Sequence, residues 1–183
     1  MIGLGGNIPS HIGSPRDTMK RALLLLQKLP LEVTKVSSVY QTAPVPASGQ
    51  PDFLNIAVSA ETQLSAQELL DAFQRIEVGC GRKPAERWSA RTMDIDLLAY
   101  GAEVLPSNRS WQSVVDDKDP AAFLEEPVIP HPRLHKRAFV LIPLLDITPK
   151  WRHPVLNMSV EELANREHIK AEGRDVVLIS PIL

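Results

Sequence analysis

Two aspartates placed two residues apart in a β-patterned segment, Asp94 and Asp96, limit what this chain can fold into more than any other feature. Side chains at positions i and i+2 of an extended strand point to the same face, so the two carboxylates project together. The apolar residues that alternate with them point the other way and are expected in a core: Met93, Ile95 and Leu97. The sequence therefore predicts a half-buried strand whose polar face carries two adjacent negative charges.

The segment ahead of this strand is cationic, which indicates what the carboxylates bind. Like charges side by side repel each other, so a compensating cation is expected. Mg²⁺ with paired carboxylates usually brings phosphates, and arginines suit a polyphosphate. The basic cluster comprises Arg75, Arg82, Lys83, Arg87 and Arg91. The alternative is a solvated strand face with ordinary surface arginines, but Asp is depleted in strands, and this context favours a metal–phosphate site.

The composition is that of an ordinary globular protein, with 44% hydrophobic and 23% charged residues. We expect one domain, residues 1–183. The net charge of −2 gives no overall attraction to nucleic acid or to anionic membranes, so neither is expected as a partner. The lone Cys80 fits a reducing compartment. No apolar run approaches the roughly 18 residues of a membrane span and no secretory signal is recognised, so a cytoplasmic location is expected.

The first hundred residues follow the order β-α-β-β-α-β. The expected strands are 2–7, 31–40, 53–61 and the segment of Asp94 and Asp96, and the expected helices begin at Ser14-Pro15 and at the capping box Ser65-Ala66-Gln67-Glu68. Three prolines make 41–51 a loop. This order is typical of the ferredoxin-like split βαβ motif, an α+β fold with an antiparallel sheet and its helices mainly on one face. The other face would be free for a site that Asp94, Asp96, Phe53 and Asn55 share.

The rest of the chain is expected to complete a core of about 2–150 and to add C-terminal elements. The expected features are a short strand at 102–105, a long surface loop at 106–126, a basic segment at 130–137 ahead of an apolar run at 138–145, a short helix from a capping box at Ser159 and a closing strand at 175–179. The long loop is inferred from mixed polarity and the lack of periodicity.

Several motifs support a more specific interpretation. The segment of the aspartates reads Arg87-Trp88-x-x-Arg91-Thr92-x-Asp94-x-Asp96. Other pieces are Gly5-Gly6-Asn7, Tyr40-x-Thr42-x-Pro44, Gln50-Pro51-Asp52-Phe53-x-Asn55, Gln74-Arg75-x-Glu77, Pro130-His131-Pro132-Arg133 and Arg137-x-Phe139-Val140-Leu141. In this order, over roughly residues 2–150, they resemble the 6-hydroxymethyl-7,8-dihydropterin pyrophosphokinase family of folate biosynthesis. Such a series is far more specific than one short motif.

The resemblance implies transfer of diphosphate from ATP to the hydroxymethyl group of the pterin, with release of AMP. Asp94 and Asp96 would hold two Mg²⁺ ions that bridge the ATP phosphates. The catalytic residues implied are Arg82, Arg91, Asp94 and Asp96. The implied ATP contacts are Gln74, Glu77, Arg82, Lys83, Trp88, Arg91, Leu97, His131 and Arg137. No residue is assigned as general base, because positioning and electrostatics suffice for an alcohol beside Mg²⁺.

The resemblance also implies a site for a flat heterocycle. The residues are Thr42, Ala43, Pro44, Val45, Phe53, Asn55, Trp88 and Phe139. Phe53 and Phe139 would sandwich the pterin while Asn55 reads its hydrogen-bonding edge. From the residues alone, core packing is the favoured interpretation of the two phenylalanines. Gln74 and Glu77 would then be solvated helix positions, and His131 an ordinary loop histidine.

The sequence departs from the family pattern near the cationic segment. The loop of residues 81–87 is one residue shorter than in familiar members, and Pro84 stands where a cation is expected. Which of Arg82 and Lys83 binds phosphate is therefore left open. Ala90 replaces a usual proline, and Pro132 stands where some members have tyrosine.

Two other functions remain as alternatives. A nucleotidyltransferase also uses a glycine turn followed by an Asp-x-Asp strand, but it would release pyrophosphate from ATP. A non-catalytic module that binds pterin or nucleotide would carry the two acids merely on its surface. Association or fusion with other folate-pathway enzymes is also left open.

Overall fold

The computed structural model describes residues 1–45, 47–83, 89–116 and 127–181. The strands are β1 (Ile2–Gly6), β2 (Leu31–Val36), β3 (Val39–Thr42), β4 (Phe53–Thr62), β5 (Asp94–Leu97) and β6 (Val177–Ser180). The helices are α1 (Pro15–Leu26), α2 (Ala66–Gly79), α3 (Asn108–Asp116), α4 (Ala138–Ile147), α5 (Val160–Ala164) and α6 (Glu167–Gly173), with a 3₁₀ turn at Leu134–Lys136. The α+β class and the antiparallel sheet predicted from the sequence are confirmed.

All strands join one six-stranded antiparallel sheet in the order β5-β1-β4-β3-β6, with β2 beside β3 on β4. In β1, Gly5 lies between Asp94 of β5 and Asn55 of β4, and Gly3 lies opposite Asp96. The missing side chains of these two glycines leave room between the aspartates and Asn55. The sequence Ile-Gly-Leu-Gly thus builds a strand that is apolar on one face and open on the other.

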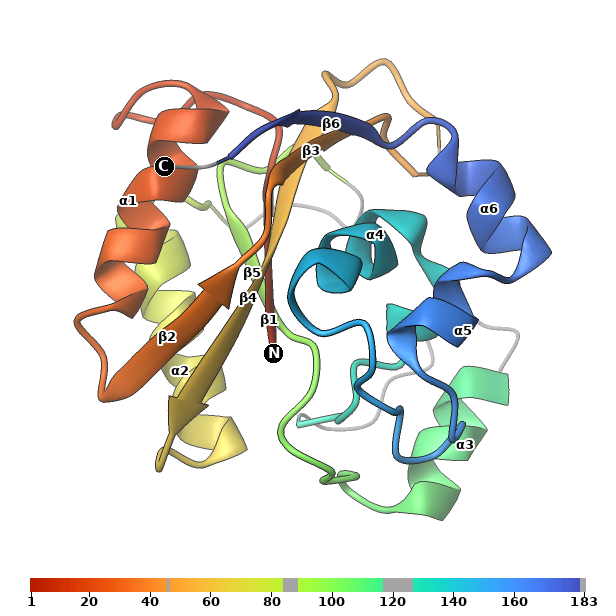
Figure 1. Ribbon diagram of the computed structural model, residues 1–183. Coiled ribbons are helices and arrows are strands. Elements are labelled where there is room, and N and C mark those ends of the chain that lie inside the picture. The colour runs from red at the N-terminus through yellow and green to blue at the C-terminus, as the bar shows by residue number, and fades with distance from the viewer. Residues whose placement is uncertain (46, 84–88, 117–126, 182–183) are drawn as a thin grey trace.

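Capping boxes begin the two helices of the predicted motif. Ser14 with Asp17 caps α1, and Ser65 with Glu68 caps α2; in each pair the serine hydroxyl and the carboxylate exchange hydrogen bonds with backbone N–H groups. The apolar faces of α1 and α2 pack on one side of the sheet (Figure 1). Met93, Ile95 and Leu97 are buried in or beside this core, as strand parity predicts.

The other face of the sheet is partly covered, so less of it is free than expected. The apolar run at 138–145 forms α4, which packs against β4 and, with α5 and α6, encloses a second apolar core. Figure 1 shows α1 and α2 on one side of the sheet and α4, α5 and α6 on the other. The remaining open part of this face is formed by β1, β4 and β5, and it lies beside the start of α4.

Three local expectations are corrected. The strand expected at 31–40 is broken at Ser37 and Ser38 into β2 and β3, which both pair with β4. Residues 102–105 form no strand, because only Leu105 makes an isolated bridge, with Ile129. The expected surface loop at 106–126 contains α3, whose Trp111 is fully buried. Trp111, Val114 and Val115 have helical spacing, but a pattern confined to nine residues is too short to identify a helix by itself.

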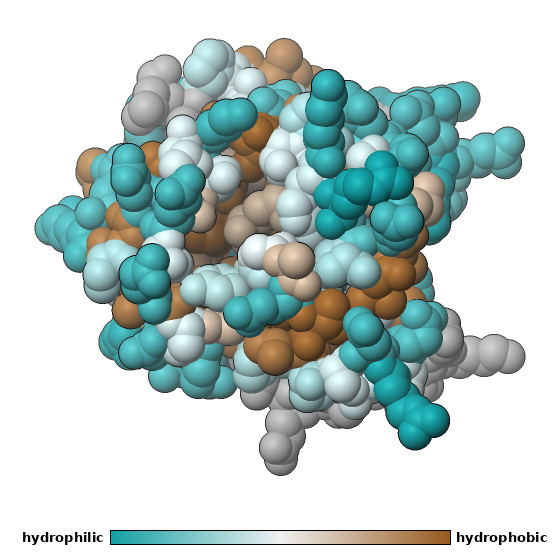
Figure 2. Space-filling model, turned by 60° about the horizontal axis from the view of Figure 1, so that its bottom comes forward, coloured by the Kyte–Doolittle hydropathy of each residue, from teal (hydrophilic) through white to brown (hydrophobic). Residues whose placement is uncertain are grey.

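The closing strand is found as β6, two residues later at its start than expected, and it pairs with β3 at the edge of the sheet. Figure 2 shows the end of the molecule opposite β6, where apolar residues form patches among polar ones. Among the described residues, no helix combines the length and the apolar character that crossing a membrane requires.

Candidate active site

A cavity lies between the open part of the sheet and the first turn of α4. It gathers most of the residues singled out from the sequence. Its lining includes Thr42, Ala43, Pro44, Val45, Phe53, Asn55, Arg91, Asp94, Asp96, Arg137 and Phe139, together with Gly3, Gly5, Gln50 and Ser89. The prediction that Asp94, Asp96, Phe53 and Asn55 share one face is therefore confirmed.

Asp94 is the electrostatic centre of this cavity. Its Oδ1 accepts hydrogen bonds from Nη1 of Arg82 at 2.7 Å and from Nη1 of Arg91 at 2.6 Å. Burial and the neighbouring Asp96 carboxylate nevertheless raise the pKa of Asp94, against the opposing effect of Arg91 and Arg82. The carboxylate pair thus remains a place where a further cation is favoured.

Glu77 is a buried carboxylate that holds Arg82 beside Asp94. It is buried at the end of α2, its Oε1 accepts the N–H of Ile95 at 2.7 Å, and it pairs with Arg82. Burial raises the pKa of Glu77 to about 7. Glu77 is therefore neither a solvated helix position nor part of the cavity wall, but joins α2, β5 and Arg82.

Arg137 lines the cavity on the side of α4, while His131 is not part of the cavity lining. Arg137 precedes α4, and its guanidinium carbon lies 5.4 Å from the centre of the Phe139 ring. Burial lowers the pKa of Arg137, while Asp96 raises it. His131 is half-buried, accepts the N–H of Arg133 on Nδ1 at 3.1 Å, and has its pKa lowered by burial and by Arg137 and Arg133 to about 3. Its imidazole is therefore neutral at neutral pH.

The apolar end of the cavity is lined by two phenylalanines and a buried amide. Phe53 from β4 and Phe139 from α4 are half-buried and line it from two facing elements. Asn55 is buried and donates from Nδ2 to Oγ1 of Thr42 at 2.9 Å. A Cβ on Gly5 would come within 2.9 Å of Oδ1 of Asn55. Only glycine leaves this amide in place.

Asn7 is a functional candidate to which the sequence analysis assigned no role. Its Nδ2 donates to Oε1 of Gln50 at 3.2 Å and to the carbonyl of Pro51 at 3.0 Å, and its Oδ1 accepts the N–H of Arg91 at 2.8 Å. One side chain thereby ties the loop before β4 to the segment before β5. A polar residue directly after a glycine pair was the available signal.

Some predicted residues lie elsewhere. Leu97 is buried in the core beneath the sheet, while Gln74 and Lys83 are exposed. Trp88, predicted for both ligands, and Pro84 lie outside the described residues.

The carboxylate pair fits a hard metal ion whose remaining ligands come from elsewhere. Within the described ranges, no group of three or more His, Cys, Asp or Glu side chains is placed to hold a metal. Two carboxylates with space in front of them suit Mg²⁺, which usually takes one or two carboxylates, water and phosphate oxygens. With arginines on one side and an aromatic slot on the other, the site defines the class of enzymes that transfer phosphate groups from a nucleotide to a small planar acceptor.

Comparison with known proteins narrows this class. The family model of 7,8-dihydro-6-hydroxymethylpterin-pyrophosphokinase matches residues 1–149, and the chain belongs to this family. It is 38% identical over 175 residues to a Bacillus subtilis 2-amino-4-hydroxy-6-hydroxymethyldihydropteridine pyrophosphokinase, covering 95% of this chain and 92% of that relative. This confirms the resemblance noted in the sequence, and the chain is a pyrophosphokinase of folate biosynthesis.

Longer relatives carry the same region within larger chains. The folate synthesis bifunctional protein of Arabidopsis thaliana is 37% identical over 147 residues, which is 80% of this chain but 23% of that protein. A crystal structure of Plasmodium falciparum HPPK-DHPS matches 97% of this chain and 46% of its own, with a TM-score of 0.67 and 16% identity. At that identity the structural match supports the fold alone.

Proposed function

We propose that this chain transfers the diphosphate of ATP to the hydroxymethyl group of 6-hydroxymethyl-7,8-dihydropterin and releases AMP, with Asp94 and Asp96 holding two Mg²⁺ ions. The observation that carries the proposal is the single cavity in which this carboxylate pair, two arginines and two phenylalanines meet. Bound Mg²⁺ supplies neutralisation of the phosphate charge.

The arginines act as the phosphate clamp. Arg82 and Arg91 each point one guanidinium nitrogen at Asp94, and the remaining N–H groups can bind phosphate oxygens. Arg137 adds a cation from the opposite wall, and neutral His131 donates or accepts a hydrogen bond. Arg82 is held in place by its ion pair with Glu77, whereas Lys83 is exposed. Arg82 is therefore the stronger candidate for binding phosphate, and Lys83 the weaker one.

The acceptor lies in the aromatic slot. Phe53 and Phe139 stack on its faces, and Asn55, fixed by Thr42, hydrogen-bonds its polar edge. This orientation brings the hydroxymethyl group to the aspartate end of the cavity, where the phosphates are held. Rate enhancement then comes from positioning and electrostatics, without a dedicated base.

Product analysis tests this function. Purified protein is incubated with ATP, Mg²⁺ and the pterin, and the adenine nucleotides are separated; AMP formed only with pterin is the expected result. The 6-methyl analogue, which lacks the hydroxyl nucleophile, is the control and should give no AMP. Release of ADP would indicate a kinase, and free pyrophosphate a nucleotidyltransferase. Binding of pterin without turnover would indicate a non-catalytic module.

A further inference from the structure

Helix α3 buries one large side chain, that of Trp111, in the protein. Trp111 is 0% exposed, and its ring packs on His153 at 4.9 Å and on His135 at 5.8 Å between ring centres. Both histidines are buried as well. None of these three residues lines the cavity of the candidate active site.

Two polar contacts join α3 to the segment 130–137. The indole N–H of Trp111 donates to the carbonyl of Pro130 at 2.6 Å, in a buried position. Near the end of α3, the carbonyl of Val115 accepts a hydrogen bond from Nζ of Lys136 at 3.0 Å. The contacts fall near the two ends of the segment, so α3 holds it along its length.

The same segment carries two residues proposed to bind ATP phosphates, His131 and Arg137. His131, directly after Pro130, donates its N–H to the carbonyl of Leu98 at 2.9 Å, next to β5. Arg137, directly after Lys136, lines the cavity. Each of these two residues is therefore one peptide unit away from a contact with α3. If a contact with α3 were lost, the segment could shift and move the guanidinium of Arg137 and the neutral imidazole of His131 relative to Asp96.

We propose that α3 braces the phosphate-binding wall, with Trp111 as a positioning residue for His131 and Arg137. This inference rests on the proposed function, in which these two side chains hold ATP phosphates. It gives residues 108–116 a role in nucleotide binding, although no residue of that helix lines the cavity. The pterin end, built by β3, β4 and Phe139, lies outside the braced segment.

The test compares two tryptophans that both pack on His153. Trp111→Phe keeps an aromatic ring but removes the hydrogen bond to Pro130. Trp151→Phe is the matched control, because Trp151 also lies against His153, at 5.8 Å, but donates to the carbonyl of Gly101 at 3.3 Å.

Steady-state constants for ATP and pterin are measured with the unfolding midpoint of each variant. Trp111→Phe should raise KM for ATP roughly five-fold, the loss of about one buried hydrogen bond, and change KM for pterin less than about two-fold. Trp151→Phe should change neither.

The opposite pattern would overturn the brace. A lower unfolding midpoint with unchanged KM for ATP would make Trp111 merely structural, and equal shifts of both KM values would mean general damage. If Trp111→Phe fails to fold, Lys136→Met, at an exposed site, should still raise KM for ATP.

Direct binding separates this proposal from the proposed function. Affinity for a non-hydrolysable ATP analogue with Mg²⁺ is measured for each protein. A wild type that binds the analogue but forms no AMP contradicts the function, while the brace is still judged by the weaker binding of Trp111→Phe. A wild type that binds no analogue contradicts both.

Discussion

Asp94 shows how a site can be neutralised in part and still attract a cation. Two arginine nitrogens lie within 2.7 Å of one carboxylate oxygen, yet burial and Asp96 keep the pKa of Asp94 raised. Removing a carboxylate from water costs more than two partly exposed arginines return. A metal ion bound to the two aspartates would compensate their charge, and Arg82 and Arg91 could then bind the substrate phosphates.

Gly5 tests the geometry of the acceptor slot. Gly5→Ala should push Oδ1 of Asn55 aside, since the new Cβ lies within 2.9 Å of it. An overpacking cost of about 1–2 kcal/mol predicts a rise of about 5- to 30-fold in KM for pterin with KM for ATP little changed. Gly79→Ala, where nothing lies within 4 Å of the added carbon, is the control. An unchanged KM for pterin in Gly5→Ala would contradict the role given to Asn55.

Individual residues could be placed from the sequence where local geometry decides the outcome. Strand parity was enough to place Asp94 and Asp96 on one face and Ile95 in the core. The burial of Glu77 could not be predicted in this way, because it depends on how α2 packs against β5. The same holds for Asn7, whose partners are 43, 44 and 84 positions away in the chain.

Asn7 connects two elements of the site, the loop before β4 and the segment before β5. Asn7→Ala removes its hydrogen bonds to Gln50, Pro51 and Arg91 together. At about 0.5–1.5 kcal/mol for a hydrogen bond, KM for both substrates should rise by roughly ten-fold. Asn165→Ala, which removes an exposed amide hydrogen bond to Glu161, is the control and should change neither. Normal KM values for Asn7→Ala would show that the two loops act independently.

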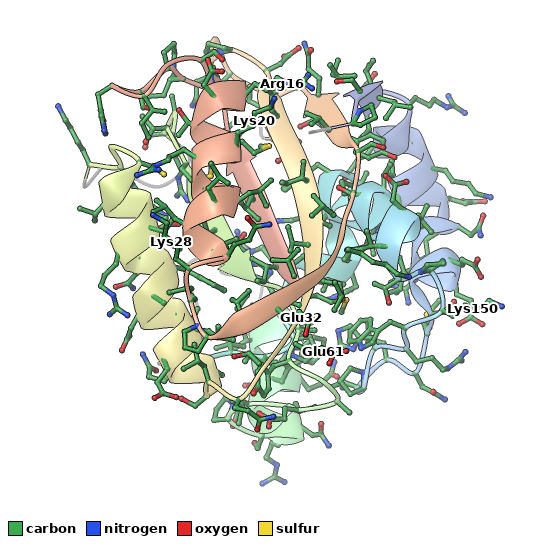
Figure 3. The ribbon with its side chains drawn as sticks, turned by 60° about the vertical axis from the view of Figure 1, so that its left-hand side comes forward. Arg16, Lys20, Lys28, Glu32, Glu61 and Lys150 are labelled. Atoms are coloured by element: carbon green, nitrogen blue, oxygen red, sulfur yellow. The ribbon has the colours of Figure 1, made fainter. Side chains whose placement is uncertain are left out.

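The pairing of β2 with β4 contains an unfavourable contact. Glu32 and Glu61 are directly opposite in the register and exposed, and Figure 3 shows both near the free edge formed by β2. Glu61→Lys should raise the free energy of unfolding by about 0.5–1 kcal/mol, because repulsion becomes attraction. Glu103→Lys changes the net charge equally at an exposed site outside this pair. Equal effects of the two variants in denaturant titrations would mean that net charge alone matters.

Elements with strong local signals were predictable, and those defined by tertiary contact were not. The capping boxes at Ser65 and Ser159 mark real helix starts. Helix α3 escaped prediction, because its stability depends on the burial of Trp111 against distant histidines. Its N-terminal signal was faint: the hydroxyl of Ser107 accepts the N–H of Ser110.

For the whole molecule, buried histidines make stability depend on pH. Burial lowers the pKa of His135 to about 3 and of His153 to about 4, from an ordinary 6.5. Between those values the unfolded chain binds more protons than the folded one, so stability falls as pH decreases below about 6.5. Glu77 and Asp94, whose pKa values are raised, act in the opposite sense.

The comparison of variants isolates the histidine effect. Unfolding midpoints are measured from pH 7.5 to 5.0 for wild type and His153→Gln. Between pH 7.5 and 5.0 the free energy of unfolding of the wild type should fall by an amount on the order of 1–2 kcal/mol through His153, and the variant should lack this decrease. His168→Gln, at an exposed position of α6, should retain the wild-type dependence. Identical pH dependence in His153→Gln and wild type would contradict the assignment.

The role of Asp94 and Asp96 as Mg²⁺ ligands is tested most directly by measuring pterin-dependent AMP formation as a function of Mg²⁺ concentration, in wild type, Asp94→Asn and Asp96→Asn. Asp71→Asn, on the exposed face of α2, is the control. Saturable Mg²⁺ dependence is expected in wild type and control. Each site variant should lose activity by a factor on the order of 100 or more while its unfolding remains cooperative. Full turnover in both site variants, or AMP formed at the same rate with Mg²⁺ chelated, would contradict this role.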